Sequence, residues 1–306
     1  VGRENVTLLN EHYRCHPKIA RWFNEAFYGG SLAVMTDIAE MQNGERGISW
    51  IDVQGEATRP TNRRSWINQS QINEAVEIIK SSIPYGLTIG IVSPFSAQAS
   101  AIARAFESEF SREQLAEVDF IAGTAHRFQG DQKDIIIFSS CVAPGITDSA
   151  AKWVEKERNL INVAVSRARQ RLVVLGHPLV TTMNCPTLSS LRSFVLEATD
   201  TDGKIEHRVD SESESRLLKA MILAGLAPLA KVDVEGFELD FAIIQNERRL
   251  NIEVDGDQHF DANRQQWRQD LIRDRVIRRA GWEVLRYPAW RCFVEPEVVG
   301  SEISSH

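Results

Sequence analysis

The sequence has 306 residues, which is long enough for two domains, and its 43% hydrophobic content supports ordinary buried cores. The net charge of −7 gives no overall attraction to nucleic acid, so any such binding must use local basic patches. The four cysteines are far apart and form no CxxC pair, which argues against a zinc site or a disulfide framework and favours a reducing cytoplasm. No apolar run reaches the roughly 18 residues of a membrane span.

Strands and helices alternate over residues 1–178, which we expect to form one domain. Pro17 suits the first turn of a helix, and the pair Gly29-Gly30 ends that helix. The largely apolar run 135–141 is typical of a central parallel strand. The expected strands are 6–9, 48–53, 87–92, 118–122, 135–141 and 171–176; the other expected helices are 71–81, 97–110 and one from 159; and 142–156 is expected to be a loop. This alternation predicts an α/β fold with a doubly wound parallel sheet.

The last third of the chain has a different composition. We expect 179–210 to be a connector that contains one helix over 191–198, and 211–306 to be a second, smaller α/β domain. The elements expected in that domain are a helix from Ser211, strands 238–245 and 250–255 joined by a polar turn, a long helix over 263–280 and a strand over 282–287.

Four motifs occur in the first domain in a fixed order. They are LLNEHYRCHP at 8–17, IVSPFSAQ at 91–98, GTAHRFQGDQKDIIIFSS at 123–140 and NLINVAVSRARQRLVVLG at 159–176. Together they resemble motifs of superfamily 1 helicases, and most of all the B-type branch of RNA-surveillance helicases and replication-associated helicase–nucleases. The resemblance implies the second RecA-like domain of such a motor. Because the sequence opens at Val1 and inside a motif, we expect it to be the C-terminal piece of a longer protein.

The chain contains no GxxxxGK[ST] phosphate loop, so the resemblance implies that a first RecA-like domain supplies this loop and the magnesium carboxylate. It also implies that Arg167 is the arginine finger, and that Arg14 is a second phosphate-facing arginine. By the same resemblance Gln129, Gly130 and Gln132 approach the ATP. Many members have Glu at the position of Gln132, and the resemblance implies that this carboxylate contacts the ribose; an amide could hydrogen-bond there as well, so the contact of Gln132 stays open. Without the other motifs, Arg167 is equally well a solvated arginine on a surface helix.

The same resemblance places four residues near the backbone of a single nucleic-acid strand: Ser93, Pro94, Gln98 and Thr124. Hydroxyls and amides there would grip phosphates without reading bases. The alternative for Ser93 and Thr124 is ordinary capping at the end of a strand.

Three carboxylates of the second domain lie on neighbouring expected strands. Glu253 and Asp255 share one face of their strand, and a hairpin would bring Asp240 close to both. Clustered oxygen ligands suit Mg²⁺ or Mn²⁺ rather than zinc, so Asp240 and Glu253 are candidate metal ligands and all three are candidate catalytic residues. Because apposed carboxylates repel, at least one should have a raised pKa without metal.

Residues 212–292 resemble the PD-(D/E)xK nuclease fold, and in particular the Vsr-like endonuclease domains at the ends of superfamily 1 helicases. Asp255 stands where the usual motif has lysine, as it does in that subfamily. His259 is a candidate substitute acid or base, or a surface histidine. Glu214 is a candidate metal-side carboxylate, or an acid favoured at a helix start.

The long expected helix carries four arginines on one stripe: Arg264, Arg268, Arg275 and Arg279. Beside a carboxylate cluster, this stripe would hold a DNA backbone. The alternative is a solvated amphipathic helix, with Asp270 and Asp274 pairing some of the charge.

The sequence therefore predicts a cytoplasmic, ATP-driven DNA translocase coupled to an endonuclease that uses Mg²⁺ or Mn²⁺, in DNA repair or in defence against foreign DNA. Its expected partners are single-stranded or branched DNA and its own first RecA-like domain, with no membrane. One alternative is that the terminal domain binds DNA without cutting it. Another is that the motor acts on RNA and carries a structural tail.

Overall fold

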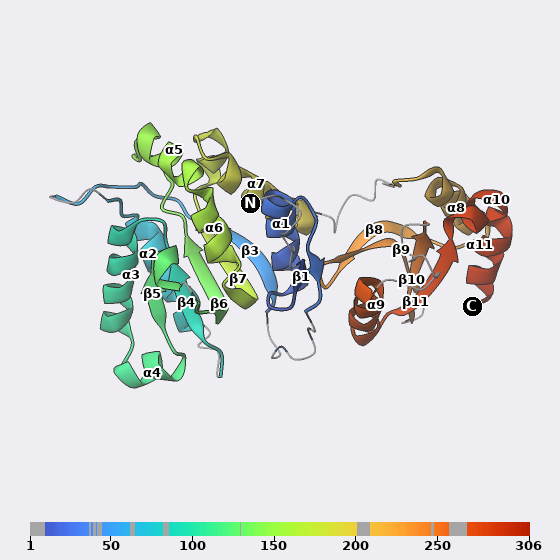
Figure 1. The fold of residues 1–306 in the computed structure, drawn as a ribbon, viewed down its shortest axis with the longest axis horizontal. Helices are drawn as coiled ribbons and strands as arrows, with labels where there is room; N and C mark the ends of the chain where they lie inside the picture. The colour runs from blue at the N-terminus through green and yellow to red at the C-terminus, as the bar shows by residue number, and fades with distance from the viewer. Residues whose placement is uncertain are drawn as a thin grey trace, which may run out of the picture. The chain divides into compact units, whose positions relative to one another are not determined.

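The computed structural model divides the chain into two compact units (Figure 1). The first comprises Val1–Leu32 and Asn43–Glu197, and the second comprises Ala33–Gln42 and Ala198–His306. The residues that the structure describes are 10–36, 38, 41, 45–61, 65–81, 86–128, 130–200, 209–245, 248–256 and 268–306. Within these ranges, no helix is long and apolar enough to cross a bilayer. The expected strand 6–9 lies outside them.

The first unit is built on a five-stranded sheet whose order is β3-β7-β6-β4-β5. Every pair of neighbouring strands is parallel. The strands are β3 (Gly47–Asp52), β4 (Ile89–Val92), β5 (Ile121–Gly123), β6 (Lys133–Ser139) and β7 (Ala168–Gly176). The central strands β4 and β6 are almost completely buried, as their apolar sequences require. The predicted parallel sheet is therefore confirmed.

Helices cover both faces of this sheet (Figure 1). On one face, α2 (Gln69–Ser81) and α3 (Ser96–Glu109) pack against the strands through a single apolar core. α1 (Pro17–Tyr28) and α6 (Arg158–Val165) cover the other face. α1 begins at a proline and ends at Gly29 in the left-handed conformation, as its sequence predicts. The core between α2, α3 and the strands includes Ile72, Val76, Ile89, Ile91, Ile102, Phe106, Ile137, Val173 and Leu175.

Several short elements of the first unit differ from the sequence predictions. Residues 142–156 were expected to be a loop, but α5 (Asp148–Lys156) is a helix that buries only Ala151 and Val154. Such a polar helix lacks the apolar periodicity that would identify it. α4 (Arg112–Glu117) begins with a capping box between Ser111 and Gln114. The strand that was expected to start at 118 is β5, which starts at 121. The remaining elements are β1 (Glu11–His12), the 3₁₀ turns Ala125–Phe128 and Pro178–Thr182, and α7 (Pro186–Asp200).

The second unit has a four-stranded sheet with the order β11-β10-β9-β8. β8 (Leu229–Val234), β9 (Phe237–Gln245) and β10 (Arg248–Asp255) are antiparallel neighbours, and β11 (Glu283–Pro288) is parallel to β10. The predicted hairpin of β9 and β10 is confirmed. β8 was not predicted; the turn that joins it to β9 is made by Glu235 and Gly236, both with positive φ.

Helices of the second unit pack on both faces of its sheet (Figure 1). α8 (Glu212–Leu223), α10 (Ala289–Val294) and α11 (Pro296–Ser305) share one core with Phe241 and Ile252. α9 (Arg268–Arg279) contributes Ile277 to a second core on the other face. The described residues also include the two-residue strand β2 (Ala33–Val34).

The core of the first unit gives a direct stability prediction. Ile137 is fully buried in the central strand β6, so Ile137→Ala should lower the free energy of unfolding by about 2–5 kcal/mol through lost contacts and an internal cavity. Leu179→Ala is the control, because Leu179 is exposed and its truncation should change stability by less than about 0.5 kcal/mol. Denaturant unfolding measures both variants, and equal losses would contradict the described packing.

Candidate functional site

Two arginines lie together at the amino end of the parallel sheet. Arg167 immediately precedes β7, and its carbonyl accepts a hydrogen bond from the Lys133 backbone at 3.1 Å. The segment that carries Arg14 is fixed to the same place, because the backbone N–H of His16 donates to Arg169 at 2.7 Å. Burial lowers the pKa of Arg167, and the positive charge of Arg14 lowers it further. The fold thus keeps two like charges close to one another.

The Arg167 guanidinium has little hydrogen bonding of its own. Its Nη1 donates only a long bond, 3.4 Å, to the carbonyl of Asp131, and its Nε is buried without a partner among the described residues. Within the same part of the chain, no ion pair joins Arg167 or Arg14 to a carboxylate. Arg167 is half-buried and Arg14 is exposed, and two guanidinium groups without carboxylate partners favour an anion with several acceptor oxygens.

The loop expected to approach a nucleotide lies beside this pair. Gly130 has a φ of +86° and is exposed, with open space where a side chain would be. Gln132 is also exposed, and its backbone N–H donates to the Asp131 carboxylate. Gln129 lies outside the described residues. Because this loop precedes β6 and Arg167 precedes β7, both lie at the amino edge of the sheet.

The residues expected to touch a nucleic-acid strand lie at the opposite, carboxyl edge, after β4 and β5. Pro94 and Thr124 line a cavity of about 520 Å³ there. Ser93 and Gln98 are completely buried. Gln98 exchanges hydrogen bonds with the Asn68 backbone and donates to Ser139 at 2.9 Å, so it fixes the strand ends instead of facing solvent. The side chains of Ser93 and Gln98 are thus enclosed by the protein, and their contact with nucleic acid stays a prediction.

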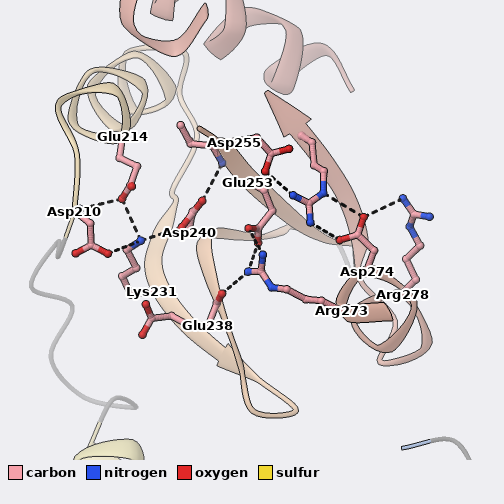
Figure 2. Close-up of polar contacts among 12 residues, drawn as sticks. Asp210, Glu214, Lys231, Glu238, Asp240, Glu253, Asp255, Arg273, Asp274 and Arg278 are labelled. Carbon is pink, nitrogen blue, oxygen red and sulfur yellow. Dashed lines mark hydrogen bonds and ion pairs between the residues drawn. The ribbon is translucent and has the colours of Figure 1, made fainter. Parts of the chain in front are cut away.

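Lys231 is the central charged residue of the second unit, and the sequence did not identify it. It lies in β8 with a φ of +54°, and the pairing of β8 with β9 skips it. This irregularity turns its ammonium toward three carboxylates, at 2.9 Å from Asp240, 3.0 Å from Asp210 and 3.2 Å from Glu214 (Figure 2). Burial opposes its charge, but the bond to Asp240 and the nearby acids outweigh burial and raise the pKa of Lys231.

Glu214 has a structural role, which matches the alternative that it is an acid favoured at the start of a helix. Its backbone N–H donates to the hydroxyl of Ser211 at 3.1 Å, and its carboxylate accepts from the Ser211 hydroxyl and from the Asp210 backbone. This pattern caps the start of α8. The same carboxylate also reaches Lys231, so the cap and the charged cluster share one side chain.

Asp240 and Glu253 are brought close, as the hairpin predicts (Figure 2). Asp240 accepts from the backbone of Val254 at 2.9 Å, and Glu253 receives two bonds from Arg273 at 2.6 and 2.7 Å. The pKa of Glu253 is raised, chiefly by burial, while Arg273 lowers it and the charge of Asp240 raises it. The expectation of one raised carboxylate pKa is confirmed, although burial contributes more than repulsion does.

Asp255 belongs to a neighbouring ion network. Arg286 of β11 bridges Asp255 and Asp274. Burial lowers the pKa of Arg286, but its hydrogen bond to Asp274 and the negative charge of Asp274 outweigh burial and raise that pKa. Asp274 therefore faces the interior and is engaged by Arg286 rather than by the expected arginine stripe. Arg275 and Arg279 are exposed on α9, whereas His259, Arg264 and the side chain of Arg268 lie outside what the structure describes.

The described residues contain no group of three or more His, Cys, Asp or Glu side chains arranged to hold a metal. The pair Asp240 and Glu253 fits Mg²⁺ in its donor chemistry, because this ion is bound through one or two carboxylates and keeps several waters. Both carboxylates are at present neutralised by Lys231 and Arg273.

The fold is that of a RecA-like unit with a parallel central sheet, followed in the sequence by a smaller unit with its own sheet. Residues 1–179 match the family AAA_12, described as an AAA domain, and this chain belongs to that family. Residues 214–306 match a second family, described as REase_MTES_1575. The prediction that the first unit is a helicase-family domain is therefore confirmed.

The relatives that this chain is similar to include two helicases. It is 30% identical over 187 residues to the probable helicase senataxin of Mus musculus, and 28% identical over 200 residues to the DNA polymerase alpha-associated DNA helicase A of Saccharomyces cerevisiae. These matches cover 58% and 57% of the chain but only 7% and 28% of the relatives, so the chain spans less than a third of either. The solved C-terminal domain of a possible DNA helicase from Lactobacillus matches 57% of this chain and 96% of its own, at 15% identity and a TM-score of 0.34.

The Lys231 cluster gives a prediction about pH. Lys231→Met leaves Asp240, Asp210 and Glu214 without their common cation, which should cost about 1–3 kcal/mol of unfolding free energy at neutral pH. The raised pKa of Lys231 sets the pH range of this cost. The contribution of its charge is fully present below its ordinary pKa of 10.5 and is lost as the pH rises above that value, so the cost should shrink at higher pH.

Lys219→Met is the matched control, because Lys219 lies on the exposed side of α8 and its loss removes the same charge. Melting curves from pH 7 up to about 11, just above the ordinary pKa of a lysine, make the comparison. A cost that is the same at every pH would contradict the described cluster.

Proposed function

We propose that the first unit is the second RecA-like domain of an ATP-dependent DNA helicase or translocase, of the B-type branch of superfamily 1. The observation that carries this proposal is the pair Arg14 and Arg167, in which the Nε of Arg167 is buried and unpaired. A γ-phosphate that faces this edge would receive both guanidinium groups, and they would stabilise the charge that develops as it is transferred. The loop at Gly130 and Gln132 would border the nucleotide.

The phosphate loop would belong to another domain of the whole protein, because this sequence contains no GxxxxGK[ST]. In a protein that carries both domains, Arg167→Ala should lower DNA-stimulated ATP turnover by roughly 10³- to 10⁵-fold, the usual effect of losing an arginine finger. Arg167→Lys should also be poor, since an ammonium cannot reproduce the planar fork of donors.

Arg169→Ala is the control, because Arg169 is exposed and its nearest acid is Asp134 at 3.5 Å. Its turnover should remain near that of the parent protein. ATP turnover that survives Arg167→Ala would show that the arginine is structural.

We further propose that the second unit is a Vsr-like, metal-dependent DNA endonuclease that acts in DNA repair, in a cytoplasmic protein. What supports this is the convergence of Asp240 and Glu253 on adjacent strands, together with the family matched over 214–306. Mg²⁺ or Mn²⁺ held by these two carboxylates would activate water and neutralise the scissile phosphate. Lys231 would supply the positive charge that Asp255, at the usual lysine position, cannot supply.

One observation favours the alternative that this unit binds DNA without cutting it. Arg273 satisfies both oxygens of Glu253, and Lys231 satisfies Asp240, so the carboxylates are already neutralised. A unit of this kind would keep the fold and use Arg275 and Arg279, which are exposed on α9, to contact the phosphate backbone.

A thermal melt with and without Mn²⁺ separates these two functions. If Asp240 and Glu253 hold the ion, Mn²⁺ should raise the melting temperature by mass action, and Asp240→Asn or Glu253→Gln should abolish both this rise and the nicking of DNA. Glu238→Gln is the control, since Glu238 is exposed on the same strand as Asp240 and its loss should change neither result. Metal-independent melting with no cutting of single-stranded, branched or duplex DNA would leave the binding unit as the better account.

A further inference from the structure

The cavity at the carboxyl edge of the first unit has a composition that the motor motifs do not explain. It has a volume of about 520 Å³, and among its described lining residues two are tryptophans and one is phenylalanine. Trp153 of α5 is 40% exposed, and its ring lies 5.6 Å from that of Phe95, at an angle of 44°. An indole that is open to solvent beside a hollow offers one free face for a planar ligand.

The sequence around Trp153 shows why this ring is left in solvent. α5 is held to the unit by the buried side chains of Ala151 and Val154, which flank Trp153 on the helix. Trp153 remains exposed, and its ring combines an apolar face with a polar N–H, which suits a binding role. Replacing Trp153 removes its ring contact with Phe95 but leaves Ala151 and Val154 in place.

The polar part of the lining fits a ligand with negative charge. The guanidinium of Arg59 lies 4.9 Å from the ring of Trp66, and both residues line the cavity. Ser65, Ser96 and Thr124 also line it, and none of the described lining residues is Asp or Glu. An aromatic platform, hydroxyl donors and a cation without nearby carboxylates are the features that hold a base and its phosphate.

We propose that this cavity holds one base of single-stranded DNA, which stacks on Trp153, while Arg59 contacts an adjacent phosphate. The inference rests on the proposed function, in which DNA crosses the edge that carries Pro94 and Thr124, and it adds a stacking site to those backbone contacts. Stacking is tolerant of sequence because every base has a π-face, so the site grips any base. The motor would then contact the strand through a base as well as through its phosphates.

The experiment measures binding of the 306-residue chain to a labelled thymidine oligonucleotide and to an abasic strand of equal length, by fluorescence anisotropy without ATP. The wild-type chain should prefer the strand that carries bases. Trp153→Ala should bind that strand roughly 5- to 150-fold more weakly, the change expected for one lost stacking contact, and should bind the abasic strand as the wild type does. Trp153→Phe should restore most of the binding.

Two further variants separate stacking from charge. Trp290→Ala is the matched control, because Trp290 is 62% exposed in the second unit and its loss should leave binding unchanged. Arg59→Ala should weaken binding to both strands and reduce the slope of log affinity against log salt by about one, as the loss of one phosphate contact requires.

The outcomes distinguish this inference from the function on which it rests. If the chain binds single strands but Trp153→Ala binds them as tightly as the wild type, the stacking site is wrong and the proposed motor function stands. If the wild-type chain binds neither strand, the placement of DNA at this edge fails, and the stacking site fails with it.

Discussion

The parallel pairing of five strands is the constraint on which the first unit depends. Because all strands run in one direction, residues that precede β6 and β7 lie at one edge of the sheet, and residues that follow β4 and β5 lie at the other. Arg167 and Gly130 are therefore separated by the height of the sheet from Pro94 and Thr124. A motor needs this arrangement, since a rigid sheet links its two ligands while keeping them apart. The buried hydrogen bonds of Gln98, which join Asn68 to Ser139, hold the carboxyl edge in place.

The second unit shows how a fold can retain charges that cost free energy to bury. Glu253 is almost fully buried with Arg273, and Asp255 is buried with Arg286, so each acid has a partner that offsets its desolvation. Such pairs contribute little net stability, and replacing them with apolar side chains is often neutral. Both acids lie on β10, and the neighbouring strand β9 carries Asp240, whose partner Lys231 has a strained backbone. This arrangement is therefore better explained by function than by stability.

Sequence reasoning identified the elements with strong apolar patterns, namely the buried strands β4, β6 and β10 and the helices α1 and α3. It missed α5, because two buried residues give no detectable period, and it missed β8, because Lys231 and Asp233 interrupt its apolar pattern. In the sites, the motifs placed Arg14 beside Arg167, and strand alternation placed Asp240 beside Glu253. Periodicity could not reveal that Lys231 would turn inward at a bulge, that Arg273 would form an ion pair with Glu253, or that Gln98 would be buried. These three features depend on contacts between residues far apart in the sequence.

The central claim is that one sheet carries phosphate-binding arginines at one edge and a nucleic-acid contact at the other. Arg14→Ala tests it most directly, in a protein that also carries the phosphate-loop domain, by measuring ATP turnover and single-stranded DNA affinity on the same preparation. The account predicts that turnover falls sharply while the DNA affinity measured without nucleotide stays within about twofold of the parent protein, a difference of less than ~0.5 kcal/mol. A parallel loss of DNA affinity would contradict the separation of the two edges.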